Sequence, residues 1–233
     1  APPPWRRLRP TSHPEGAGAA AMMEQQVAAR TRITTVVFDV GNVLISWDPR
    51  HLYRRIFDGD EERVERFLAE ICTPEWNLEQ DRGRSFAEAV AERVAAFPQW
   101  RAEIEAYDRR WHEMVPGAIE GTVRILEALR AAGVPTYAIT NFSAEKFALA
   151  RSRFPFLEGF LGTVVSAHER LVKPDEAIYR LLVDRYGLNA EECLFIDDSP
   201  ANVAAARAVG MAAHHFTDPA RLAEALRAEG LPV

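Results

Sequence analysis

The stretch ITTVVFD at residues 33–39 is a run of apolar and β-branched residues that ends on the carboxylate of Asp39. A second run, CLFIDD at 193–198, ends on Asp197 and Asp198 much later in the chain. Such runs are typical of buried parallel strands, and open α/β sheets bind their ligands at the carboxyl ends of those strands. An aspartate after a strand is more often only a turn or helix-cap residue. The two runs together predict that these carboxylates meet at one sheet edge and share a divalent cation.

Two further segments between these runs carry groups that can bind phosphate. TYAITN at 136–141 ends on the hydroxyl of Thr140 and the amide of Asn141, although either side chain could instead cap the next helix. Lys173 precedes Pro174, and a proline in the first turn of a helix would leave the lysine ammonium free to reach an anion. In chain order the segments supply a nucleophile, a hydroxyl, a cation and paired acids, which is the set of groups that phosphoryl transfer needs.

The same segments form motifs that resemble those of the haloacid dehalogenase-like (HAD) hydrolases. The motifs are FDVGNVL at 38–44, AITN at 138–141, KPDEAIY at 173–179 and FIDDSPAN at 195–202. This resemblance implies a doubly wound, mainly parallel, five-stranded Rossmann-like α/β sheet with an α-helical cap of the C1 type inserted after the first motif. The GNV form of the first motif is similar to small bacterial phosphatases that act on sugar phosphates such as glucose 1-phosphate.

The alternation of strand and helix signals independently predicts the same organisation. We expect core strands at 33–39, 134–140, 161–166, 192–197 and 211–216, and core helices at 118–132, 143–153, 175–186, 200–209 and 219–229. Between Arg50 and Pro116 the apolar pattern is helical, with helices expected at 50–57, 60–72, 74–80, 85–96 and 99–114. The predicted parts are a disordered leader at 1–30, a hydrolase core from 31–48 and 116–233, and a helical cap at 49–115.

The composition argues against several kinds of partner. A net charge of −6 leaves no basic footprint, so we expect no nucleic acid partner. No apolar run approaches the roughly 20 residues of a membrane helix, so we expect a soluble protein with no membrane partner. Cys72 and Cys193 lack metal or redox spacing, and two buried thiols favour a cytoplasmic location. A monomer and a homodimer both stay open, because apolar cap residues could form either a dimer face or an ordinary core.

The chemistry predicts a magnesium site around Asp39. A carboxylate attacks a dianionic phosphate only when a cation screens the charge, and an all-oxygen site favours Mg²⁺. The expected ligands are Asp39, the carbonyl of Gly41 and Asp198, with Asp198 chosen because it aligns with that role in the family. Asp197 would orient this set, and Asn202 would brace Asp198. Thr140 and Lys173 would hold the transferring oxygens of a small phosphorylated metabolite.

One position departs from the family pattern. Most phosphatases of the family carry a second aspartate two residues after the nucleophile, as general acid and base, and this chain has Gly41 there. General acid–base catalysis contributes about 10²–10⁴-fold in rate, so we expect either slow turnover of alkyl phosphates or another route for the proton. Asp48, Asn42 with a water, or a substrate hydroxyl could provide that route.

The polar segment WNLEQDRGR at 76–84 interrupts the helical pattern of the cap at Gly83. In related hydrolases a cap loop at this position faces the active site, so Trp76, Gln80 and Arg82 are candidates for substrate contact. The alternative is a solvated turn. Asn42 and Asn141 complete the candidate substrate-binding residues.

The sequence therefore predicts an enzyme, a Mg²⁺-dependent phosphatase acting through an aspartyl-phosphate on Asp39. One alternative is a 2-haloacid dehalogenase, whose halide leaves without a proton, although the charge of Asp197 and Asp198 would repel a haloacid carboxylate. A second alternative is a pseudoenzyme that binds a metal and a phosphorylated ligand or partner protein without turnover. Only Gly41 supports that second alternative.

Overall fold

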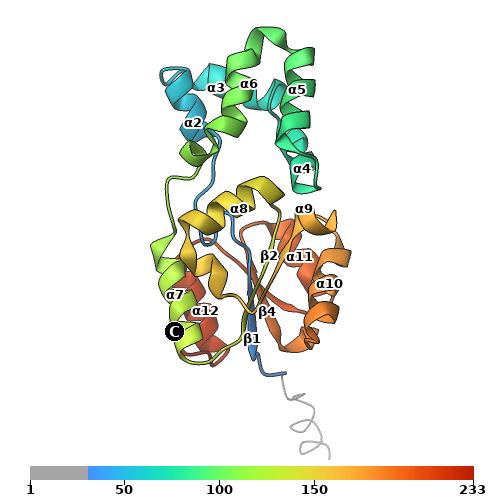
Figure 1. The fold of residues 1–233 in the computed structure, drawn as a ribbon. Coiled ribbons are helices and arrows are strands. Elements are labelled where there is room, and N and C mark those ends of the chain that lie inside the picture. The colour runs from blue at the N-terminus through green and yellow to red at the C-terminus, as the bar shows by residue number, and fades with distance from the viewer. Residues whose placement is uncertain (1–30) are drawn as a thin grey trace, which may run out of the picture. The chain divides into compact units, whose positions relative to one another are not determined.

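The strand β1 (Thr35–Phe38) lies in the middle of a parallel sheet in the computed structural model, which describes residues 31–233. The predicted leader at 1–30 lies outside the described residues. Among these residues the sheet has five strands in the order β3-β2-β1-β4-β5. The other four strands are β2 (Thr136–Thr140), β3 (Gly162–Val165), β4 (Cys193–Asp197) and β5 (Ala212–His215). All neighbouring pairs are parallel, so the predicted doubly wound α/β fold is confirmed (Figure 1).

Helices cover both faces of this sheet, as the alternation of its side chains requires. Val36 and Phe38 pack into a cluster with Leu126 of α7 and Leu222 of α12, whereas Val37 packs on the opposite face with Ile178 of α10. The core helices are α7 (Glu120–Ala131), α8 (Ala144–Arg153), α9 (Ser166–Glu169), α10 (Glu176–Tyr186), α11 (Pro200–Ala208) and α12 (Pro219–Ala228). The short helix α9 was not predicted, because four residues are too few to show helical periodicity.

The chain between β1 and α7 is helical, as its apolar pattern predicts. It contains α2 (Arg50–Ile56), α3 (Glu61–Glu70), α4 (Pro74–Asp81), α5 (Phe86–Ala96) and α6 (Arg101–Arg109), with 3₁₀ turns at η1 (Pro98–Trp100) and η2 (Trp111–Met114). We call residues 50–114 the helical insertion. The prediction of one helix over 99–114 is wrong, because the backbone leaves the helical conformation at Arg110 (φ −112°, ψ 22°). Residues Arg32–Val233 form one compact unit, so the division into a core and a separate cap stays a prediction.

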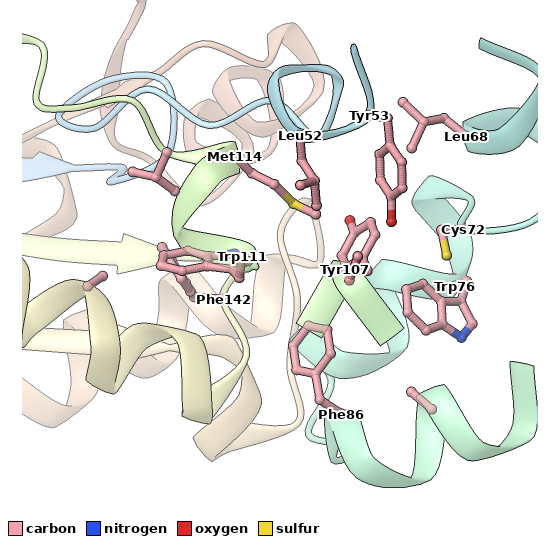
Figure 2. Close-up of a cluster of buried hydrophobic side chains, with 14 of the residues drawn as sticks. Leu52, Tyr53, Leu68, Cys72, Trp76, Phe86, Tyr107, Trp111, Met114 and Phe142 are labelled. Carbon is pink, nitrogen blue, oxygen red and sulfur yellow. The ribbon is translucent and has the colours of Figure 1, made fainter. Parts of the chain in front are cut away.

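A buried aromatic cluster holds the insertion together (Figure 2). The ring centroids of Tyr53 and Phe67 are 4.5 Å apart, and those of Trp76 and Tyr107 are 5.1 Å apart. Trp111 of the insertion meets Phe142, which follows β2, with centroids 5.8 Å apart. The cluster therefore continues from the insertion into the sheet side of the molecule.

None of the described helices is long and apolar enough to cross a membrane.

Candidate active site

Asp39 directly follows β1 at the carboxyl end of the sheet. Its backbone N–H donates to the carbonyl of Ile196 at 2.8 Å, and its Oδ1 accepts from the N–H of Val40 at 2.7 Å. Because β2 and β4 flank β1, the ends of those strands bring Thr140 and Asp197 to the same edge. The strand order reverses direction between β1 and β4, and open α/β sheets hold their ligands at such a switch point.

The ammonium group of Lys173 joins these acids. It lies 2.8 Å from Oδ1 of Asp39 and 2.7 Å from Oδ2 of Asp197, and it donates to the carbonyl of Ile139 at 3.1 Å. Only 3% of Lys173 is exposed, so these contacts are well shielded from water. Burial alone would lower the pKa of Lys173, but the two carboxylates raise it above its usual value. Burial also raises the pKa of Asp39, an effect that Lys173 opposes and Asp197 reinforces.

The adjacent acids Asp197 and Asp198 have different environments. Asp197 is fully buried and bonded to Lys173, to the N–H of Ser199 at 2.8 Å and to Nδ2 of Asn202 at 3.0 and 3.1 Å. Asp198 is much more exposed than Asp197. Partial burial of its carboxyl, together with the charge of Asp197, raises its pKa. The prediction that Asn202 braces Asp198 is therefore wrong, since its amide holds Asp197 instead.

The donor set fits a divalent cation. Oxygens of Asp39, Asp197 and Asp198 all lie within 4.8 Å of one another. One ammonium group, that of Lys173, balances only part of their negative charge. The set is made of carboxylate oxygens, which are the ligands that Mg²⁺ prefers. The hydroxyl of Thr140 is buried at the end of β2 without a protein partner, so it is available to a ligand oxygen.

Other predicted residues also hold the backbone of the site in place. Asn141 exchanges hydrogen bonds with the main chain of Lys173, so both ends of its amide are already used. Pro174 lies before the N-cap of α10, which is Asp175, and not in the first helical turn; the Lys173–Pro174 peptide bond is cis. Asn42, at φ 55°, accepts through Oδ1 from the N–H of Trp47 at 2.9 Å and thereby holds the loop after β1.

A narrow cavity of about 80 Å³ lies between this edge and the insertion. Its lining residues are Gly41, Trp47, Asn77, Asp81, Phe86, Trp111, Asn141, Phe142, Ser143 and Lys146. Asp48 does not line it and instead accepts from the N–H of Arg50 at 2.9 Å, beside a separate groove of about 730 Å³ that Asn42 also lines. The structure therefore does not bring Asp48 to the position that a substitute acid needs.

A model of one protein family matches most of the chain. It describes haloacid dehalogenase-like hydrolases and matches residues 33–210. This chain belongs to the haloacid dehalogenase-like hydrolases.

The chain is similar to two curated proteins and to a solved structure. Sesquiterpene phosphatase astK of Aspergillus oryzae is 29% identical over 194 residues, covering 81% of this chain and 92% of that protein. GMP/IMP nucleotidase YrfG of Escherichia coli is 34% identical over 102 residues, covering 42% of this chain and 46% of that protein. The wild-type HAD family enzyme BT-2542 of Bacteroides thetaiotaomicron, solved with magnesium and inorganic phosphate, has a TM-score of 0.59 at 20% identity, covering 80% of this chain and 95% of that one.

The insertion of this HAD hydrolase places three predicted substrate contacts away from the narrow cavity. Trp76 is 3% exposed and packs on Tyr107 in the aromatic cluster (Figure 2). Gln80 is fully buried and donates to the carbonyl of Trp76 at 2.6 Å, and Arg82 pairs with the neighbouring Glu79 at 2.7 Å near the surface. Helical phase explains the first two, because Trp76 and Gln80 are four residues apart and share the face of α4 that turns into the insertion. Arg82 follows the last residue of α4 and faces solvent.

The next face of α4 contributes two residues that the sequence analysis missed. Asn77 and Asp81 each lie one position after an inward-facing residue, and both line the narrow cavity. Lys146 of α8 was also missed; it pairs with the carboxylate of Asp108 in α6 and lies over the ring of Phe86 at 4.6 Å. The sequence carried little signal for these residues, because α4 is only weakly amphipathic and a glutamine such as Gln80 is not expected to be buried from its residue type.

Proposed function

We propose that this HAD hydrolase is a Mg²⁺-dependent phosphatase that hydrolyses a small phosphomonoester through an aspartyl-phosphate on Asp39. The observation that carries the proposal is the meeting of Asp39 with Lys173 at 2.8 Å and with two further carboxylates within 4.8 Å. This is a nucleophile surrounded by the charges that phosphoryl transfer requires. The relatives named as phosphatase and nucleotidase, and the neighbour solved with magnesium and phosphate, support the same reaction.

Each residue at the edge has a task in this reaction. A carboxylate oxygen of Asp39 attacks phosphorus while Lys173 and Thr140 bind the equatorial phosphoryl oxygens and stabilise their growing charge. Bound Mg²⁺, held by Asp39, Asp198 and the carbonyl of Gly41, would screen the negative charge between nucleophile and phosphate. Asp197 keeps Lys173 in place and is itself fixed by Asn202 and Ser199.

The narrow cavity supports a small, polar leaving group. At about 80 Å³ it accepts only a small part of a ligand, and its walls combine aromatic rings with Asn77, Asp81 and Lys146. A sugar has both apolar faces for such rings and hydroxyls for such polar groups. We therefore propose a sugar phosphate or a phosphate of similar size as the substrate. The buried free thiols of Cys72 and Cys193 support a cytoplasmic location.

The alternatives from the sequence have weaker support. The acid cluster would repel a haloacid carboxylate, which opposes the 2-haloacid dehalogenase. A protein that only binds its ligand does not need a nucleophile, and the position of Asp39 beside Lys173 therefore opposes the pseudoenzyme. Neither monomer nor homodimer is favoured by the described surface, whose exposed large hydrophobic residues are Leu149 and Leu161.

The deciding experiment is hydrolysis of 4-nitrophenyl phosphate with Mg²⁺ and with EDTA, using Asp39→Asn as the blank. Asp184→Asn is the matched control, because Asp184 is an exposed aspartate in α10. We expect Mg²⁺-dependent turnover in the parent and the control and none in Asp39→Asn. EDTA-resistant chloride release from 2-haloacids would instead favour the dehalogenase, and an absence of both activities the binding protein.

A further inference from the structure

The narrow cavity beside Gly41 contains a single carboxylate, that of Asp81. Expulsion of an alkoxide from a phosphomonoester requires a proton at the leaving oxygen, and Gly41 has no side chain to supply it. The other acids of the described site already have roles in the proposed reaction. Asp39 is the nucleophile, Asp198 is assigned to the metal, and Asp197 is hydrogen-bonded to Lys173, Ser199 and Asn202. A proton donor must therefore come from another element of the fold.

The backbone of Asp81 is fixed where the insertion meets α8 and α9. Its carbonyl accepts from Oγ of Ser166 at 2.6 Å, and the same Oγ accepts from the N–H of Phe142 at 2.9 Å. Gly83 follows at φ +104°, so close to α9 that an added Cβ would lie 2.9 Å from the carbonyl of Ala167. The end of α4 is thus packed tightly against the sheet side, which gives Asp81 a defined position.

The carboxyl group of Asp81 is held but not neutralised by an ion pair. Its Oδ2 accepts from Nδ2 of Asn77 at a long 3.4 Å, and the backbone N–H of Ser143 favours the charged form of the carboxyl. The cation in the cavity wall, that of Lys146, is already paired with Asp108. Since none of the described residues forms an ion pair with Asp81, its carboxyl keeps lone pairs for a ligand in the cavity.

The charge environment suits proton transfer. Burial raises the pKa of Asp81 to about 7, while the charge of Lys173 and the N–H of Ser143 oppose the rise. Lys173 also contacts Asp39, so Asp81 and the nucleophile share one cation. A general acid works best when its pKa lies near the working pH.

We propose that Asp81 is the general acid and base of this active site, supplied by the insertion in place of a side chain at Gly41. This proposal rests on the phosphatase function proposed above. As an oxygen of Asp39 bonds to phosphorus, the bond from phosphorus to the leaving oxygen breaks, and that oxygen keeps the electron pair and takes the proton of Asp81. The alcohol departs and Asp81 is left as a carboxylate. Water then attacks phosphorus and gives a proton to Asp81, and the phosphorus bond to Asp39 breaks, releasing phosphate and restoring both acids.

The test compares Asp81→Asn with the parent on two aryl phosphates that differ in leaving-group basicity. 4-Nitrophenolate departs without a proton, whereas phenolate from phenyl phosphate depends on one. The quantity compared is kcat/KM, because it includes only the steps up to formation of the phosphoenzyme. We expect Asp81→Asn to lose about 10²–10⁴-fold on phenyl phosphate and much less on 4-nitrophenyl phosphate. It should also accumulate phosphoenzyme, seen by intact mass as one added phosphoryl group, because the base for the second step is missing.

A rescue variant separates proton transfer from a structural role. A Cβ at Gly41 would meet nothing within 4 Å, so Gly41→Asp can introduce a carboxylate without a clash. Gly41→Asp in the Asp81→Asn background should recover phenyl phosphate hydrolysis, whereas Asp184→Asn alone should behave as the parent. Asp48→Asn tests the rival acid and should not show the selective loss.

The outcomes separate failure of this proposal from failure of the phosphatase function. Suppose that the parent hydrolyses both substrates. If kcat/KM of Asp81→Asn then falls equally on both substrates, or falls on neither, Asp81 is not the acid. A selective loss in Asp48→Asn would transfer the role to Asp48. If the parent hydrolyses neither substrate with Mg²⁺, the phosphatase function fails and this proposal fails with it.

Discussion

Asn141 and Lys173 exchange two hydrogen bonds across the sheet edge. Nδ2 of Asn141 donates to the carbonyl of Lys173 at 2.9 Å, and the N–H of Lys173 donates to Oδ1 of Asn141 at 2.8 Å. The side chain after β2 thus fixes the backbone that carries the buried ammonium group. This pairing gives the asparagine that follows Thr140 a structural role.

Replacing Asn141 with alanine should destabilise the protein and misplace Lys173. The change leaves the N–H and carbonyl of Lys173 without their partners, which costs about 1–3 kcal/mol for a buried group. Denaturant unfolding measures the loss, and 4-nitrophenyl phosphate turnover should fall with it. Asn189→Ala should cost less, because the side chain of Asn189 bonds to Glu191 and Glu192 on an exposed turn. Equal stability of Asn141→Ala and the parent would contradict this role of the pair.

The two adjacent acids should respond differently to the same substitution. Asp197→Asn should lower stability strongly, because the buried Lys173 loses a charged partner, and breaking a buried pair costs about 3–5 kcal/mol. Asp198→Asn should leave stability close to that of the parent, since Asp198 is exposed, but should weaken Mg²⁺ binding. Thermal unfolding across a Mg²⁺ titration measures both effects, as a shift in the metal-free Tm and in the Mg²⁺ concentration that raises it. If Asp197→Asn weakened Mg²⁺ binding and Asp198→Asn lowered the metal-free Tm, the metal would be assigned to Asp197.

The sheet edge could be predicted from the sequence because strand ends determine it. Asp39, Thr140 and the acid pair each close an apolar run, and parallel strands bring such positions together whatever the intervening chain does. Even Lys173 was placed correctly at this edge, although the predicted role of Pro174 was not. Roles that depend on side-chain hydrogen bonds, such as those of Asn141, Asn42 and Asn202, could not be predicted in this way.

The insertion side of the site could not be predicted from spacing alone. Within the predicted segment at 76–84, Asn77 and Asp81 line the narrow cavity, whereas the predicted contacts Trp76, Gln80 and Arg82 do not. A shift of one position along a helix rotates a side chain by about 100°, which separates buried Trp76 and Gln80 from cavity-facing Asn77 and Asp81. Asp48 was considered as a substitute acid because it is close to Asp39 in sequence, and spacing gives no reason to consider Asp81, which lines the narrow cavity.

Lys146→Met should loosen the contact between the insertion and α8. Nζ of Lys146 donates to the backbone carbonyl of Asp108 at 2.9 Å, pairs with its carboxylate, and lies 4.6 Å from the ring centroid of Phe86. Methionine keeps the apolar stem but removes all contacts of the charge. We expect faster hydrogen exchange in α5 and α6 and a raised KM, with the sheet unchanged. Lys146→Arg, which keeps the charge, should recover part of the protection, and unchanged exchange in Lys146→Met would contradict this role.

The pH dependence of phenyl phosphate hydrolysis should report the proton on Asp81. Since burial raises the pKa of this carboxyl to about 7, its acid form is lost as the pH rises through that value, and kcat/KM should fall on the alkaline side. The charged and titratable groups around it are Lys173, Lys146 and Tyr107, and the pKa of Tyr107 is raised well above its usual value by burial. 4-Nitrophenyl phosphate provides the control, because the phosphate group of both substrates titrates alike and only phenolate depends on the acid. The alkaline fall should therefore be steeper for phenyl phosphate in the parent and should disappear in Asp81→Asn, whereas the same fall in both proteins would assign it to another group.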